Sequence, residues 1–141
     1  KTLVTLALAL ALPAAAHAET GRLIDLTVTG TMQMQGMNMP IPQVVREVCM
    51  PAKQLDPRNL SRDSHRCTVS NYQAAGDTVS FHLTCQGAGI TNGDGVFHHH
   101  ADGGMDGRMH TVSDMHGHSM TMDANYLGTP KGGCDYQPPK S

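Results

Sequence analysis

The sequence is poor in aromatic residues and in charge. It has no tryptophan, two phenylalanines and three tyrosines, so large rings cannot supply most of a hydrophobic core. Charged residues make up 16% of the 141 residues, which is below the highly charged composition of a solvated disordered chain. Lysine and arginine number 10 against 12 acidic residues, so the basic excess of a nucleic-acid-binding protein is missing. The length predicts one folded domain.

Complete catalytic motifs are also missing from the sequence. It contains neither a phosphate-binding loop nor a dinucleotide fingerprint. Residues 117–121 resemble a nucleophile elbow but lack its last glycine. Residues 102–107 have the aspartates and glycines of a calcium loop, without its ligand spacing or its closing glutamate. We therefore expect a protein that is not an enzyme.

The amino-terminal segment, residues 1–18, has the pattern of a secretory signal peptide. An apolar run over residues 2–12 ends at Pro13, and Ala16-His17-Ala18 fits the small-x-small cleavage pattern. We expect cleavage after Ala18 and a periplasmic or secreted protein. The run is too short to cross a bilayer as a helix, and no later stretch is apolar enough to do so.

Four cysteines in an exported chain indicate two disulfides. Residues 67–85 carry apolar side chains and two cysteines at odd positions and polar side chains at even ones, which is the alternation of half-buried strands. A three-residue loop at residues 75–77 would keep apolar residues opposite one another and would set Cys67 opposite Cys85. We therefore predict the Cys67–Cys85 disulfide, which leaves Cys49 to pair with Cys134.

The remaining segments also predict an all-β fold. The expected strands include residues 23–34, 44–50, 96–101, 108–113 and 119–127, with one short helical turn within residues 51–60. Glycine-rich turns are expected at residues 87–95 and 102–107. This pattern predicts a single antiparallel sheet rolled into a barrel or half-barrel. The β domain should span residues 19–134, and residues 135–141 should form a flexible tail.

Several motifs resemble those of the domain of unknown function 3617 family. They are Val48-Cys49-Met50-Pro51, Gly76-Asp77-Thr78-Val79, Thr84-Cys85, Asn92-Gly93-Asp94-Gly95-Val96, and Met120-Thr121-Met122 ahead of Cys134. The resemblance covers nearly the whole mature chain and rests on the ordered set of four cysteines. The family usually opens with Gly-Leu-Trp-Glu, whereas this chain has Gly21-Arg22-Leu23-Ile24-Asp25, so a tryptophan contact is lost. The resemblance implies an exported antiparallel β domain without an established activity, and it carries over no catalytic residue.

Ten methionines stand out against the few aromatic residues. Four of them form the pattern M-x-M-x-x-M-x-M over residues 32–39, and five more lie between residues 105 and 122. Methionine fills irregular cores and forms adaptable binding surfaces, which favours a non-enzymatic module that binds a small apolar ligand or a protein partner. Thioethers are also soft ligands that suit Cu(I), so copper binding is the alternative function.

Histidines add to the metal hypothesis, because imidazole binds copper, zinc and nickel. A loop at residues 102–107 would set His99 opposite His110, and a loop at residues 115–118 would set Asp123 opposite His110. One face would then carry a two-histidine, one-carboxylate set for a harder ion: His99, His110 and Asp123. The other face would carry a soft set for copper: His98, His100, Met109 and Met122. His116 and His118 are further candidates; the alternative is that all these histidines are solvated strand residues.

Overall fold

The computed structural model describes residues 19–60 and 66–138. The predicted signal peptide lies outside these residues. Seven strands and one short 3-10 helix follow one another along the chain: β1 (Glu19–Met34), β2 (Met37–Pro51), η1 (Pro57–Leu60), β3 (Cys67–Ala75), β4 (Thr78–Gln86), β5 (Ile90–His99), β6 (Met105–Met115) and β7 (His118–Tyr136). The predicted all-β class, with one helical turn and two disulfides, is confirmed.

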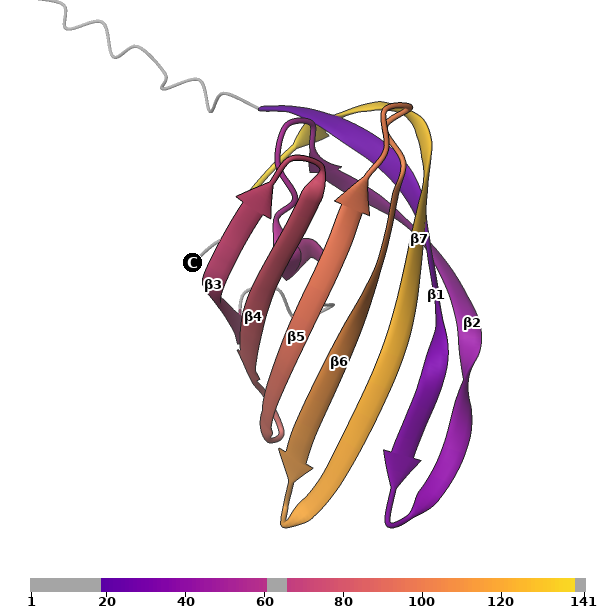
Figure 1. The fold of residues 1–141 in the computed structure, drawn as a ribbon, viewed down its shortest axis with the longest axis vertical. Helices are drawn as coiled ribbons and strands as arrows, with labels where there is room; N and C mark the ends of the chain where they lie inside the picture. The colour runs from indigo at the N-terminus through magenta and orange to yellow at the C-terminus, as the bar shows by residue number, and fades with distance from the viewer. Residues whose placement is uncertain (1–18, 61–65, 139–141) are drawn as a thin grey trace, which may run out of the picture.

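The strands form one antiparallel sheet in the order β2-β1-β7-β6-β5-β4-β3. The sheet is strongly curled, as Figure 1 shows, but β2 and β3 remain its two edges, so it is a half-barrel and not a closed barrel. Successive residues of a strand point to opposite faces, and burial alternates accordingly along β4, β5 and β6. The buried side chains lie on the concave face. Within residues 19–60 and 66–138, no helix is long and apolar enough to cross a membrane.

The concave face is packed by pairing large side chains with glycines on the neighbouring strand. Phe81 lies opposite Gly95, and Phe97 lies opposite Gly107. A methyl group at Gly95 would lie 2.5 Å from Phe81, and one at Gly107 would lie 2.2 Å from Phe97, so each ring occupies the space that the glycine leaves. The two rings stack with their centroids 5.7 Å apart.

These glycines also explain where the predicted turns are wrong. Residues 87–95 and 102–107 were expected to be turns, but β5 begins at Ile90 and β6 begins at Met105. Gly95 and Gly107 lie inside strands because a ring packs against their backbone. At the other end of the chain, β7 continues two residues beyond the predicted end of the domain, and Tyr136 is buried.

The β3–β4 hairpin forms the predicted disulfide by a different route. The three-residue loop is wrong, since Ala75 pairs with Thr78 around a two-residue turn. A bulge between Ser70 and Gln73, where Asn71 has a φ of 51°, then shifts the register by one residue. Cys67 therefore still lies opposite Cys85, and the disulfide between them is confirmed.

The second predicted disulfide, Cys49–Cys134, is also confirmed. It joins β2 to β7, the two strands that flank β1. The bridge passes over Gly21, where a methyl group would lie 2.8 Å from Sγ of Cys49 and 3.0 Å from Sγ of Cys134. The glycine thus leaves room for a bond that fastens the last strand to the first hairpin.

Residues 52–60, which follow β2, cover part of the concave face. Leu55 and Leu60 are buried in the same core as Phe81 and Phe97. The segment is held by hydrogen bonds: Arg46 donates to the carbonyl oxygen of Leu60, and Tyr72 donates to that of Leu55. This part of the hollow is therefore filled by the chain itself.

The ring–glycine pairing leads to a stability prediction. Gly107→Ala should lower the free energy of unfolding by about 1–3 kcal/mol, because the added methyl group overlaps the Phe97 ring in a packed core. Gly87→Ala is the control, because a methyl group there meets nothing within 4 Å; it should change the value by less than about 0.5 kcal/mol. Urea unfolding measures both, and equal effects of the two substitutions would contradict the pairing.

Candidate functional site

Six methionines gather on the concave face near the tips of two hairpins. Met32 of β1 pairs with Met39 of β2 on one side and with Met122 of β7 on the other. In the next row Met34 of β1 pairs with Met37 of β2 and with Met120 of β7. We call this set the methionine surface; its members are Met32, Met34, Met37, Met39, Met120 and Met122.

The methionine surface is partly open to solvent. Met37 is 56% exposed, and the other five members are half-buried. Their exposure contrasts with that of Met50, Met105 and Met109, which are 3–6% exposed in the core. Methionine therefore has two separate uses in this chain, as core filling and as a surface.

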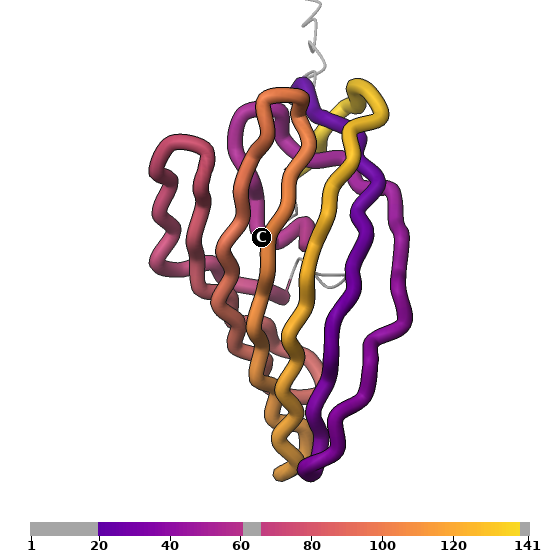
Figure 2. The backbone as a smooth tube through the Cα atoms, turned by 45° about the vertical axis from the view of Figure 1, so that its right-hand side comes forward, coloured from indigo at the N-terminus to yellow at the C-terminus, as the bar shows by residue number. Residues whose placement is uncertain are grey.

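The two hairpin tips lie next to the methionine surface. In Figure 2 the tips of the β1–β2 and β6–β7 hairpins come together at the lower end of the molecule. Nε2 of Gln35 and Nδ1 of His118 are 3.4 Å apart, within hydrogen-bonding distance. Met115 and His118 pair with each other one row beyond Ser113 and Met120, on the same face. His118, predicted as a candidate ligand, thus borders the methionines.

Histidines and aspartates alternate along one row of the opposite, convex face. His82 of β4, Asp94 of β5, His110 of β6 and Asp123 of β7 are register partners in that order. Nδ1 of His82 lies 2.9 Å from Oδ1 of Asp94, and Nδ1 of His110 lies 2.7 Å from Oδ1 of Asp123. The predicted pairing of His110 with Asp123 is confirmed, whereas Asp94 was missed because the segment containing it was assigned to a turn.

The predicted pairing of His99 with His110 is wrong. His99 pairs with Met105 instead, because the turn occupies residues 100–104 and β6 begins at Met105, three residues before the expected start of this strand at residue 108. Two backbone hydrogen bonds between His100 and residues 103 and 104 close that turn. His99 therefore lies on the concave face, while His110 lies on the convex one.

The structure does not bring the predicted soft set together. His98 pairs with Asp106, and Nε2 of His100 lies 2.6 Å from a carboxylate oxygen of the same aspartate, on the exposed side of the sheet. Met109 is buried on the concave face. His116 lies in the exposed β6–β7 turn. Among the residues that the structure describes, no three His, Cys, Asp or Glu side chains are grouped so that they could hold a metal ion.

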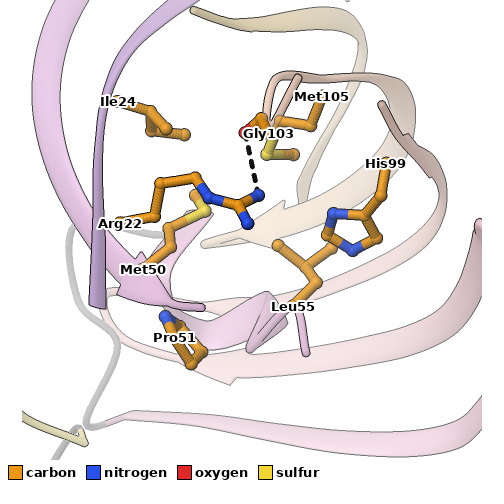
Figure 3. Close-up of a pocket in the computed structure, with 8 residues that line it drawn as sticks. All are labelled: Arg22, Ile24, Met50, Pro51, Leu55, His99, Gly103 and Met105. Carbon is orange, nitrogen blue, oxygen red and sulfur yellow. Dashed lines mark hydrogen bonds between the residues drawn. The ribbon is translucent and has the colours of Figure 1, made fainter. Parts of the chain in front are cut away.

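His99 lines a small cavity at the other end of the concave face. Figure 3 shows its ring and the Arg22 guanidinium on the cavity wall, with Arg22 donating a 3.0 Å hydrogen bond to the carbonyl oxygen of Gly103. The cavity measures about 20 Å³ and is otherwise lined mainly by Met50, Leu55 and neighbouring apolar side chains. This volume has room for a water molecule and not for an organic ligand.

The environment of His99 favours the neutral imidazole. Its Nε2 atom is buried, and no hydrogen-bond partner for it occurs in the described part of the chain. Burial lowers the pKa of His99 below its ordinary value of 6.5, and the positive charges of Arg22 and His100 lower it further, against the opposing effect of Asp77. Neither a second titrating group nor a nucleophile is among the residues lining this cavity.

These features define the class of protein: a half-barrel held by two disulfides, with an exposed methionine surface on its concave side. The chain belongs to the family described as protein of unknown function (DUF3617), which matches residues 25–134. The resemblance inferred from the cysteine motifs is thereby confirmed. Comparison with curated proteins and with solved structures gave no match.

The lowered pKa of His99 makes stability depend on pH. Below pH 6.5 the unfolded chain binds a proton that the folded chain resists, so this residue's contribution should be lost as the pH falls through 6.5 toward the lower folded pKa. His99→Gln does not titrate and should lose less unfolding free energy between pH 7.5 and pH 5 than the wild type. Urea unfolding at both pH values tests this, and an identical pH dependence would contradict it.

Proposed function

We propose that this protein is an exported, non-enzymatic binding module whose methionine surface takes an apolar segment of a partner protein. The observation that carries the proposal is the placement of six methionines in two adjacent rows of one face, all of them at least partly exposed. A flexible thioether side chain can repack against apolar groups of different shapes, which suits a surface that receives a partner.

The openness of the methionine surface favours a protein segment over a small molecule. Small-ligand sites are usually enclosed cavities of about 300–1,000 Å³ that bury most of the ligand. The methionine surface is formed by neighbouring strands that end in two hairpin tips, and its outer member, Met37, is largely exposed. A chain segment laid across these strands could cover several methionines at once.

Export is part of the proposal and is supported by the cysteines. All four form disulfides, and such bonds persist in oxidising compartments such as the periplasm. The signal-peptide pattern of residues 1–18 also supports export. The non-enzymatic role is supported by the chemistry around His99, whose cavity offers an arginine and apolar side chains as neighbours.

Copper binding by the C-terminal strands was the alternative predicted from the sequence. Its soft set is divided between the two faces of the sheet, with His98 and His100 on one side and Met109 and Met122 on the other. The geometry therefore supports the apolar binding surface better than it supports a site built from those four residues.

A synthetic amphipathic peptide of leucine and lysine can probe the proposed surface. The wild-type protein should bind the labelled peptide saturably, measured by fluorescence anisotropy. Met34→Gln combined with Met37→Gln should weaken binding about thirtyfold, because each substitution removes roughly 1 kcal/mol of apolar contact. Leu127→Gln is the matched control, since Leu127 is 52% exposed on the convex face, close to the 56% of Met37.

The result that overturns the proposal is equally specific. If the peptide does not bind saturably, or if Leu127→Gln weakens binding as much as the methionine double substitution, the methionine surface is not the binding site. Saturable binding of a small dye such as anilinonaphthalene sulfonate at the methionine surface, without binding of the peptide, would assign a small apolar ligand instead.

A further inference from the structure

The cysteine sulfurs of this chain are not available to metals, so its thioethers are the softest ligands left. Cys49 is bonded to Cys134, and Cys67 is bonded to Cys85. No free cysteine remains. A soft monovalent cation that meets the folded protein would find sulfur only in methionine side chains, and only the exposed ones are accessible.

The register concentrates these exposed thioethers in a small area. β1 is the middle strand of the three that carry the methionine surface, so Met32 and Met34 each have a methionine partner on both sides. Neighbouring strands lie about 4.8 Å apart, and alternate residues of one strand lie about 7 Å apart. Six sulfurs are thus carried within three strand widths and two rows.

Two physical features allow several of these sulfurs to converge on one ion. The sheet is curled, and the methionine surface is on its concave face, so the side chains of the three strands project into the inside of the curve. Methionine also has three rotatable bonds, so its sulfur can move by several ångströms without a change in the backbone. Met37 and the half-buried members keep enough contact with solvent for an ion to enter.

We propose that the methionine surface is a binding site for a soft monovalent cation, Cu(I) or Ag(I), held by thioethers. Met32 and Met34 are the central ligands, because they lie on the middle strand and every set of three neighbouring sulfurs within the methionine surface includes at least one of them. This site differs from the sets predicted from sequence, since it uses the first hairpin and needs no histidine. It also uses a different property of methionine from the proposed partner binding, namely the sulfur atom in place of the apolar surface.

Silver is the practical probe, because Ag(I) shares the ligand preference of Cu(I) and does not undergo redox reactions with the protein. Protein labelled with ¹³C at the methionine ε-methyl groups is titrated with silver nitrate in chloride-free buffer and followed by NMR. The ε-methyl signals of the methionine surface should shift on addition of the first equivalent. Those of Met50 and Met105, which lie in the core around the His99 cavity, should not. Zn(II), which prefers nitrogen, oxygen and thiolate ligands, should shift none of them.

Leucine substitution separates this site from the proposed partner binding. The double substitution Met32→Leu and Met34→Leu keeps the apolar surface and removes two sulfurs, so Ag(I) affinity should fall by at least about tenfold while binding of the leucine–lysine peptide persists. Met50→Leu is the control and should leave Ag(I) affinity unchanged. Retained peptide binding also shows that the double variant is folded.

Three results would overturn the proposal: uniform shifts of all methionine signals, no shift of the surface methionines, or unchanged Ag(I) affinity in the double leucine variant. The first and second are observed in the wild type and do not depend on how well any variant folds. Loss of peptide binding with intact Ag(I) binding would reject the proposed function alone, so the two proposals fail independently.

Discussion

The concave face of this sheet depends on a steric pairing between an aromatic ring and a glycine on the next strand. Phe81 lies against Gly95 and Phe97 against Gly107, each so close that a methyl group on the glycine would force the ring to move. Because the rings lie over bare backbone, Phe81, Phe97 and Tyr126 form a contiguous row of rings from β4, β5 and β7, the first two stacked and the last two tilted. A chain without tryptophan can build its core in this way.

The same register determines where the core ends. Residues 52–60 cover the rows that contain the rings, with Leu55 and Leu60 buried in the same core. Farther along the strands the rings give way to methionines on β1, β2 and β7, bordered on β6 by the buried hydroxyl groups of Thr111 and Ser113. The sheet therefore has one part whose packing is rigid and specific and another whose side chains are flexible and partly solvated.

Much of this arrangement follows from the period of two in the sequence. Alternation predicted the strands and the Cys67–Cys85 disulfide, which left Cys49 for Cys134, but it could not predict that a bulge between Ser70 and Gln73 compensates for a two-residue turn. The register of β5 against β6 could not be predicted, since glycine occurs both in turns and opposite rings. Gly107 was expected in a turn, but it lies in β6 opposite the Phe97 ring. His110 was paired correctly with Asp123 because Gly117 lies in a turn and faces no ring.

The methionine surface was visible in the sequence only as three M-x-M patterns, two of them within residues 32–39 and the third far along the chain at residues 120–122. Alternation places the two methionines of each pattern on one face, but only the strand order β2-β1-β7 shows that the three faces coincide. No local signal in the sequence specifies that the first hairpin pairs with the last strand. The grouping of the six methionines on one face therefore depends on the strand order, which could not be predicted from the sequence.

The choice of methionine at these six positions still requires a physical reason. Strand propensity does not supply it, because exposed strand positions favour β-branched and aromatic side chains. Core filling explains Met50, Met105 and Met109, which are buried, but not Met37, which is more than half exposed. A surface of leucine or valine would be as apolar, yet it would lack both the flexibility and the sulfur of methionine. The position of these side chains, partly exposed and side by side, thus favours a role in binding. Substitution by leucine can separate the contribution of the sulfur from that of the apolar surface.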